Sequence, residues 1–301
     1  MSTKGKGKQR MQFPKLYCRK SHYVYLIILV LVLCLTIPTV SRIVKRDITD
    51  ADGNRYVGEM EGRIKQGFGR YEMVDGTVYE GEFKNDLPHG EGNIHFDDNS
   101  YYVGQFQNGL PHGQGTYSMS NGDVYIGSIV KGELNGNGVY TYEATGSTFE
   151  GTFLDGVRHG FGTLTEANGS QYIGGFVHDL KEGLALEIDG DLDEFRGFFR
   201  NGVKHGEGVV KIVADGVLRF QSWNTGRLEL DETIVPIENC RLTIDGIEWM
   251  FKGNECIDGL AHGEGRAIAL DGSAYINHGV FILGKLIKGI TTSFQLPILD
   301  E

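Results

Sequence analysis

Five histidines recur in one sequence context, each followed by glycine, and recurring histidines raise the question of a metal site. They are His89, His112, His159, His205 and His262. The five histidines occupy equivalent positions of an internal repeat that is described below. If each unit of this repeat supplies two strands, equivalent residues lie about 10 Å apart, because neighbouring strands are spaced by about 4.8 Å. Zinc needs its nitrogen ligands about 2.1 Å from one ion. We therefore expect structural histidines that cap a turn or bond to a loop, and no metal site.

Carboxylates recur in the same way, at Glu80, Glu82, Glu91 and their counterparts. Paired carboxylates can carry out acid–base chemistry. An active site is singular, however, whereas these residues return in each unit, which favours a solvated strand face. The GxG stretches have no helix-opening pattern and no GK[ST] ending, so they are not phosphate loops.

A third acidic set, Glu229, Asp231 and Glu232, lies in a divergent stretch that shows no nucleophile–base–acid combination. An enzyme with its site hidden in residues 227–250 is the least favoured hypothesis. We predict a chain without catalytic residues, metal or cofactor.

Two further kinds of chemistry depend on the compartment. Cys240 and Cys256 could form a disulfide in an oxidising environment, although their spacing cannot establish their distance. Asn168-Gly169-Ser170 is an N-x-S sequon that falls in a predicted turn. If this part of the chain is lumenal in a eukaryote, Asn168 is a candidate glycan acceptor.

Charge is divided unevenly along the 301 residues. Residues 1–46 contain ten Lys or Arg and no acidic residue, so residues 47–301 hold 19 basic and 40 acidic residues, a net of −21. Such an acidic body should repel nucleic acid and anionic lipid head groups. The 45 glycines, about twice the usual share of roughly 7%, require their own explanation.

The amino-terminal segment predicts a membrane anchor. Residues 1–22 form a basic tail, and residues 23–40 are free of charge, a length at the short end for a membrane-spanning helix. A cleaved signal peptide and a buried helix are the alternatives, but no A-x-A-like site follows the apolar run. Basic residues lie mainly before the span, so we expect a single-pass signal-anchor protein with a cytoplasmic amino end. A linker at 41–55 would then lead to an extracytoplasmic or lumenal body.

The body is built from an internal repeat of 23 or 24 residues. The pattern aromatic-x-Gly starts at Tyr56, Tyr79, Tyr102, Tyr125, Phe149, Tyr172 and Phe195. A second mark follows ten residues later, as HGEG at 89–92 or HGQG at 112–115, weakened to EGLA at 182–185. Turn pairs such as Asn121-Gly122 close several units, and such pairs favour hairpins.

These marks predict one β-hairpin per unit. Tyr79, Gly81 and Phe83 alternate onto one face of a strand, while Glu80 and Glu82 point to the other. HGEG would begin the returning strand. Glycine has no side chain, so we expect the rings to pack over glycines of the adjacent strand or unit. The fold class is therefore an all-β, antiparallel solenoid of hairpins that forms a single sheet.

These residues resemble the MORN repeat family, whose consensus runs Y-x-G-x-[FW]-x-x-G followed by H-G-x-G. The resemblance covers residues 56–226, as seven units plus a degenerate one. Residues 227–248 are expected to be a divergent insertion, and 249–301 a final unit and a carboxy-terminal cap, since HGEG returns at 262–265.

The resemblance implies an adaptor, tether or organiser of assemblies rather than an enzyme. We expect a membrane-anchored scaffold that binds a protein partner along the repeat sheet, and no nucleic acid. The aromatic row Tyr79, Tyr102, Tyr125, Phe149, Tyr172 and Phe195 is the candidate contact surface, with a purely structural role as the stronger alternative for each ring. Smaller apolar patches on the opposite face include Val103 and Ile126. Direct lipid recognition by the repeats is the alternative function, and the acidic body disfavours it.

Overall fold

The computed structural model describes residues 42–235 and 240–294. By its internal contacts the chain divides into residues 1–43 and 44–301, and the fold concerns the second unit. The predicted membrane span at 23–40 lies outside the described residues. Within the described ranges, no helix is long and apolar enough to cross a membrane.

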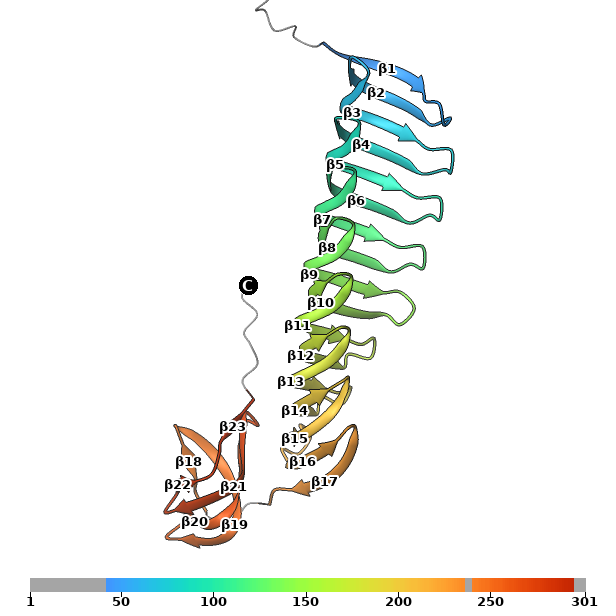
Figure 1. The fold of residues 1–301 in the computed structure, drawn as a ribbon. Coiled ribbons are helices and arrows are strands. Elements are labelled where there is room, and N and C mark those ends of the chain that lie inside the picture. Colours follow the sequence, from blue (N-terminus) through green and yellow to red (C-terminus); the bar gives the residue numbers. More distant parts are fainter. Residues whose placement is uncertain (1–41, 236–239, 295–301) are drawn as a thin grey trace, which may run out of the picture. The chain divides into compact units, whose positions relative to one another are not determined.

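The described chain is made of strands and turns (Figure 1). The strands are β1 Ile43–Thr49, β2 Arg55–Glu61, β3 Ile64–Glu72, β4 Val78–Lys84, β5 Leu87–His95, β6 Tyr101–Gln107, β7 Leu110–Ser118, β8 Val124–Val130, β9 Glu133–Tyr142, β10 Ser147–Leu154, β11 Val157–Thr165, β12 Gln171–Val177, β13 Leu180–Ile188, β14 Glu194–Arg200, β15 Val203–Lys211, β16 Leu218–Asn224, β17 Arg227–Thr233, β18 Thr243–Ile244, β19 Ile247–Ile257, β20 Leu260–Ala269, β21 Ala274–Ile282, β22 Lys285–Lys288 and β23 Thr292–Ser293.

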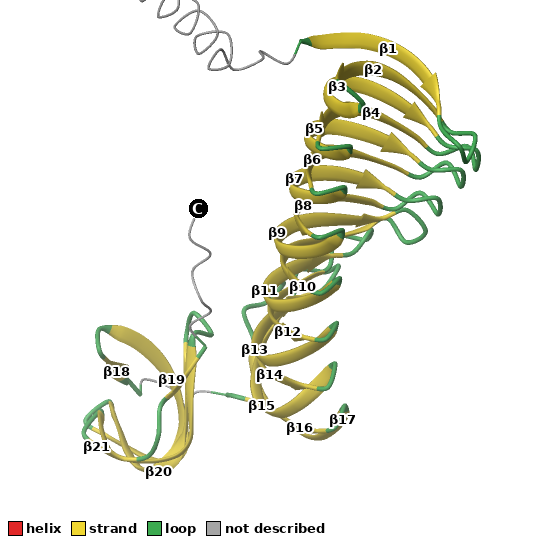
Figure 2. Ribbon diagram, turned by 45° about the horizontal axis from the view of Figure 1, so that its top comes forward, coloured by secondary structure: helices red, strands yellow, loops and turns green. Residues whose placement is uncertain are grey.

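Strands β1–β17 belong to one sheet of 17 strands. From β2 to β17 each strand pairs antiparallel with the next strand of the chain, as in β4–β5 and β5–β6. Each repeat unit therefore supplies one hairpin, and the predicted all-β antiparallel sheet is confirmed. Figure 2 shows these strands as curved ribbons joined by short turns.

Two boundaries differ from the expectation. The predicted linker 41–55 contains β1, whose valine and isoleucines suit a strand although Lys45, Arg46 and Asp47 break the apolar pattern. The predicted insertion 227–248 begins with β17, which pairs with β16 and alternates Leu228 and Leu230 with acidic residues. Charged residues are common on strands at the edge of a sheet, and this composition concealed both strands.

Glycine pairs face each other in the hairpins from β2 to β11 and in β14–β15, and the ring of the same unit lies over them; in β12–β13 Ala185 takes the place of the second glycine, opposite Gly174. Gly81 is opposite Gly92, and a Cβ built on Gly92 would come within 2.5 Å of the Tyr79 hydroxyl oxygen. A Cβ on Gly81 would meet the Gly92 Cα at 2.5 Å. The Tyr79 hydroxyl donates a hydrogen bond to the Glu82 carbonyl oxygen at 2.7 Å. The expected fit of ring against bare glycine is therefore confirmed, within one unit.

The rings also contact one another from unit to unit. Tyr79 makes edge-to-face contacts with Phe83 of its own unit, at 5.0 Å between ring centroids, and with Phe106 of the next unit, at 4.9 Å. Aromatic pairs prefer this geometry. The result is one continuous core of buried rings on what we call the inner face of the sheet.

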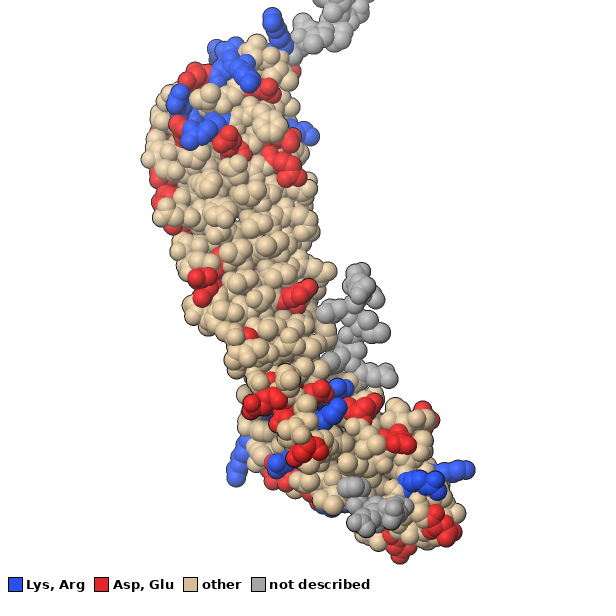
Figure 3. Space-filling view, turned by 180° about the vertical axis from the view of Figure 1, so that it is seen from behind, with Lys and Arg blue, Asp and Glu red and all other residues tan. Residues whose placement is uncertain are grey.

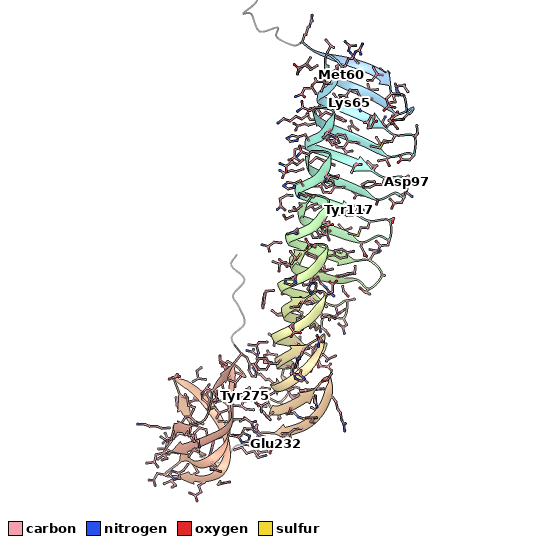
Figure 4. All side chains as sticks on the ribbon, viewed as in Figure 1. Met60, Lys65, Asp97, Tyr117, Glu232 and Tyr275 are labelled. Atoms are coloured by element: carbon pink, nitrogen blue, oxygen red, sulfur yellow. The ribbon has the colours of Figure 1, made fainter. Side chains whose placement is uncertain are left out.

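Strands β18–β23 form a separate six-stranded sheet, so the prediction of a single sheet is wrong for the carboxy-terminal part of the described chain. It packs against outward-facing residues at the end of the first sheet, where Val209, Leu218 and Phe220 share a buried cluster with Tyr275 and other residues of the second sheet. Polar contacts surround the cluster: the Tyr275 hydroxyl donates to Glu207 at 2.7 Å. Figure 4 labels Tyr275 and Glu232 at this contact.

The glycine contact predicts a severe effect of a single methyl group. Replacing Gly92 with alanine should lower the free energy of unfolding by about 1–3 kcal/mol, because the new Cβ overlaps the Tyr79 ring in a tightly packed core. Urea unfolding followed by circular dichroism measures this. Gly190→Ala is the matched control, since its Cβ would meet no atom closer than 3.9 Å. Equal loss of stability in both variants would contradict the ring–glycine fit.

Candidate partner-binding surface

The six aromatic residues predicted as the contact surface lie in the core. Tyr79, Tyr102, Tyr125, Phe149, Tyr172 and Phe195 are between 0 and 4% exposed. A partner could reach these rings only by displacing their neighbours. The structure therefore favours their packing role, and a contact surface must be sought among the residues beside them.

A second set of residues on the same face is half-buried and accessible. The returning strand of each early unit places one large side chain cross-strand from a core ring: Tyr71, Ile94, Tyr117 and Tyr140. Two residues further along the chain are Met73, Phe96, Met119 and Tyr142, which alternation places on the same face. All eight are partly exposed. We call them the inner strip.

Members of the inner strip contact one another across units. The rings of Phe96 and Tyr117 meet edge to face at 6.4 Å between centroids. The Tyr140 hydroxyl lies 3.2 Å from the Met119 sulfur and donates to Asp123 at 2.8 Å. Tyr140 and Tyr142 are 4.5 Å apart between centroids. The strip is therefore continuous from β5 to β9.

Burial and hydrogen bonds favour the neutral form of Tyr140 and Tyr71. Burial is the larger cause and the hydrogen bond to Asp123 is the next, and both raise the pKa of Tyr140 above its ordinary value of 10.0. The pKa of Tyr71 is also raised, mainly by burial and to a smaller extent by the hydrogen bond to Asp50. Neutral phenols offer an apolar ring face with a polar tip, a combination enriched at binding surfaces.

The centre of the inner strip lies in a part of the chain with almost no charge. Between residues 99 and 130 Asp123 is the single charged residue, and it is buried. Acidic residues instead occupy the turns that join one unit to the next, at Asp52, Asp75, Asp97, Asp98 and Glu143, all exposed. Figure 4 shows Asp97 at the tip of such a turn and Tyr117 nearer the middle of the strands. We call these five residues the acidic rim.

The inner face changes character after β10. In the place of Pro88 and Pro111, later units carry Arg158, Lys181 and Lys204. The Lys181 ammonium lies 4.5 Å from the Tyr172 ring centroid, and the Lys204 ammonium lies 4.1 Å from that of Phe195. Charges close over the core rings here. In the first unit the Lys65 ammonium likewise lies 3.6 Å from the Tyr71 ring centroid, so the accessible aromatic surface is confined to the strands from β5 to β9.

Glu187 joins two of these cations. Lys181 and Lys204 approach its carboxylate oxygens at 3.1 and 2.8 Å. Burial would raise the pKa of Glu187, but the hydrogen bond and charge of Lys204, together with the charge of Lys181, outweigh burial and lower it below 4.5.

The outer face offers a smaller apolar surface. Val103 is 48% exposed and Ile126 is 56% exposed, as predicted from their outward positions. Two residues further along the same strands, β6 and β8, are the uncharged polar residues Gln105 and Ser128. Figure 3 shows few Lys, Arg, Asp or Glu side chains over the middle of the sheet, and more over the first strands and the carboxy-terminal part.

The recurring histidines lie at the start of the returning strands. His205 Nδ1 accepts a hydrogen bond from the Thr225 amide in the following turn at 3.3 Å, which is the expected structural role. No three His, Cys, Asp or Glu residues in the described ranges are grouped to hold a metal ion.

The other predicted sites stay predictions. Burial is the main cause and a hydrogen bond with Cys256 is the next, and together they raise the pKa of the Cys240 thiol to about 12. The two side chains are therefore neighbours, and the structure holds them as thiols. Asn168 is exposed in its turn, where its side-chain oxygen accepts a hydrogen bond from the Ser170 amide at 3.0 Å.

The acidic set of the divergent stretch is engaged in structural contacts. Glu229 accepts a hydrogen bond from Asn224, and Asp231 pairs with Arg219 at 2.5 Å. Glu232 binds Lys252, also at 2.5 Å, and Arg266. Glu232 and Glu207 also line a polar cavity of about 1030 Å³ beside the second sheet. Two of the carboxylates that line the cavity, Glu232 and Glu207, already have partners on the protein itself.

Comparison with protein families identifies MORN repeats in this chain. The sequence model of the MORN repeat matches residues 79–101, 102–124, 125–144, 149–171 and 195–211. These five stretches are hairpins of the 17-stranded sheet and include most of the inner strip. No curated protein matches the sequence.

Two solved structures show only distant similarity. One is the TCP domain of SAS-4 (dCPAP) in complex with a proline-rich motif of Ana2 (dSTIL) of Drosophila melanogaster, with 14% identity over 68% of this chain and 87% of that chain and a TM-score of 0.30. The other is a catalytically inactive virginiamycin B lyase from Staphylococcus aureus with quinupristin, with 8% identity over 78% and 94% of the two chains and a TM-score of 0.14. These TM-scores are too low to support any conclusion about this chain.

The Glu187 contacts predict a pH-dependent contribution to stability. A folded pKa below the unfolded value of 4.5 means that the contribution is present above about pH 4.5 and is lost as the pH falls through the lowered folded pKa. Glu187→Gln should cost roughly 1–2 kcal/mol at pH 7, and its difference from the wild type should shrink below pH 4. Urea unfolding from pH 3 to 7 measures both. Glu80→Gln, which removes an exposed outer-face carboxylate instead, is the matched control, and a constant deficit for Glu187→Gln would contradict the linkage.

Proposed function

We propose that this protein is a non-catalytic, membrane-anchored scaffold that holds a protein partner on the inner strip of its repeat sheet. The observation that carries the proposal is the continuous row of half-buried Tyr, Phe, Met and Ile side chains from β5 to β9, whose central part, residues 99–130, has Asp123 as its single charged residue. Interface cores are enriched in aromatic residues and Met and depleted of charge. The MORN repeats support a binding or scaffold role in general terms.

Membrane anchoring rests on the sequence of residues 23–40, with the basic tail before them. The body would then lie on the far side of the membrane from the cytosol. Direct lipid recognition by the repeats is the alternative, and the net charge of −21 over residues 47–301 makes anionic lipid a poor ligand. Salt-insensitive flotation of the repeats with acidic liposomes would favour the lipid alternative over a protein partner.

Proximity labelling in the native cell tests the scaffold function. A labelling enzyme fused to the full chain should mark a small set of proteins, and Tyr117→Glu should remove the partner by placing a charge in the centre of the inner strip. Ile126→Glu is the matched control, because it adds the same charge on the outer face at a residue that is 56% exposed. Thermal melting confirms that both variants fold. Labelling that is unchanged in Tyr117→Glu would overturn the proposal.

Glycosylation of Asn168 tests on which side of the membrane the repeat body lies. If the body is lumenal, the wild-type chain expressed in a eukaryotic secretory cell should carry one enzymatically removable glycan, and Asn168→Gln should abolish the mobility shift. Asn121→Gln, in a similar turn that is not a sequon, should leave the shift intact. Absence of the glycan, combined with protease digestion of the body from the cytosolic side of sealed vesicles, would reverse the proposed orientation.

A further inference from the structure

We propose that the inner strip binds a proline-rich segment in the polyproline II conformation, with lysine or arginine among its residues. The proposal names the chemistry of the partner and so rests on the proposed scaffold function. The proline-rich motif of the SAS-4 complex lends it no support, since that similarity has a TM-score of 0.30. Its basis is the spacing, exposure and charge of the residues on β3–β9.

The spacing of the strip matches the pitch of polyproline II. Each unit adds two strands, so Tyr71, Ile94, Tyr117 and Tyr140 follow one another at about 9.6 Å. A polyproline II helix has three residues per turn and rises about 3.1 Å per residue, so every third residue returns to one face after about 9.3 Å. A segment lying across the strands would present one proline to each unit, with a drift of only about 0.9 Å over three units.

Other backbone conformations match less well. An α-helix returns to one face after seven residues, or about 10.5 Å, and would drift by about 2.7 Å over the same three units. An extended strand repeats its side chains every 6.8 Å or so, which is not commensurate with the units. The repeat therefore selects the polyproline II pitch among the regular conformations.

The chemistry of the strip also suits proline. Proline rings pack on flat aromatic faces, and a polyproline II segment has few conformations to lose on binding. Tyr117 and Tyr140 provide half-buried ring faces, and Met119, whose sulfur contacts the Tyr140 hydroxyl, is an adaptable neighbour. No charged residue other than the buried Asp123 interrupts residues 99–130.

The acidic rim defines the charge of the partner. Its five carboxylates line the turns beside the strip, and the turns 50–54, 73–77, 96–100, 119–123 and 143–147 contain no lysine or arginine. A proline-rich segment with basic residues would meet complementary charge at one edge while its prolines occupy the uncharged centre. Complementary charge at a rim mainly speeds association and makes it sensitive to salt.

Fluorescence anisotropy of a defined peptide tests the proposal. The probe is fluorescein-labelled decaproline with two lysines at each end, which spans about three turns of polyproline II, and the protein is the full chain in detergent micelles. A comparison peptide replaces the prolines with alternating glycine and serine and keeps the four lysines. We expect the proline peptide to bind and the comparison peptide to bind at least about tenfold more weakly.

Variants assign the binding to the strip. Tyr117→Ala should weaken the proline peptide by about tenfold or more, as expected for a central aromatic contact, whereas Ile126→Ala on the outer face should leave affinity unchanged. If Tyr117→Ala melts at a lower temperature than the wild type, Tyr117→Leu takes its place in the binding assay, because leucine keeps most of the packing volume. Asp97→Asn combined with Asp98→Asn should reduce the salt dependence of binding.

Three results would overturn the inference: no binding of the proline peptide, equal binding of the two peptides, or equal loss in the Tyr117 and Ile126 variants. Failure here is distinguishable from failure of the scaffold function. If Tyr117→Glu removes the labelled partner in cells but decaproline does not bind, the scaffold stands and the polyproline II ligand is wrong. If labelling is independent of Tyr117, the scaffold function itself is wrong.

Discussion

The close approach of two bare glycines within most of the hairpins is the constraint on which the sheet depends. Gly81 and Gly92 leave just enough room for the Tyr79 ring to lie across both strands, and its hydroxyl binds the Glu82 carbonyl. Units that open with Phe149 or Phe195 keep the same ring position without the hydroxyl. The ring therefore matters more than its hydrogen bond, and the unusual glycine content of the chain is the consequence of this packing.

The two faces of the sheet differ in which side chains are accessible, and this difference changes along the length of the sheet. On the inner face, the early units leave Tyr and Met side chains accessible, while Lys181 and Lys204 cover the later rings. On the outer face, Val209 and Phe220 are covered by the second sheet. That sheet seals the outward residues at the end of the repeat, and its buried cluster includes none of the inner-strip residues.

The repeat could be predicted from the sequence because its marks are local: an aromatic residue, a glycine two positions later and a second glycine motif at a fixed distance specify hairpin, register and ring contact together. Accessibility could not be predicted in the same way. Tyr79 and Ile94 are cross-strand neighbours on one face, yet Tyr79 is buried and Ile94 is not. The difference depends on how each side chain lies on a curved sheet, which alternation does not encode. The stretch 99–130, in which Asp123 is the single charged residue, is the sequence signal that could have indicated the accessible surface. The sequence pattern does not predict strand β17, and it predicts only one repeat unit within the second sheet. In both places the residues depart from the repeat.

Each core ring is held by its own hairpin and the adjoining one, as Tyr79 is by Phe83 and Phe106, and by nothing further away. Packing of this kind has no fixed length. Duplication of a single unit within the gene could insert one more hairpin without disturbing any distant contact, and would lengthen the accessible aromatic row by one step. Related chains could in this way evolve to hold longer or shorter segments while keeping the same chemistry at every step.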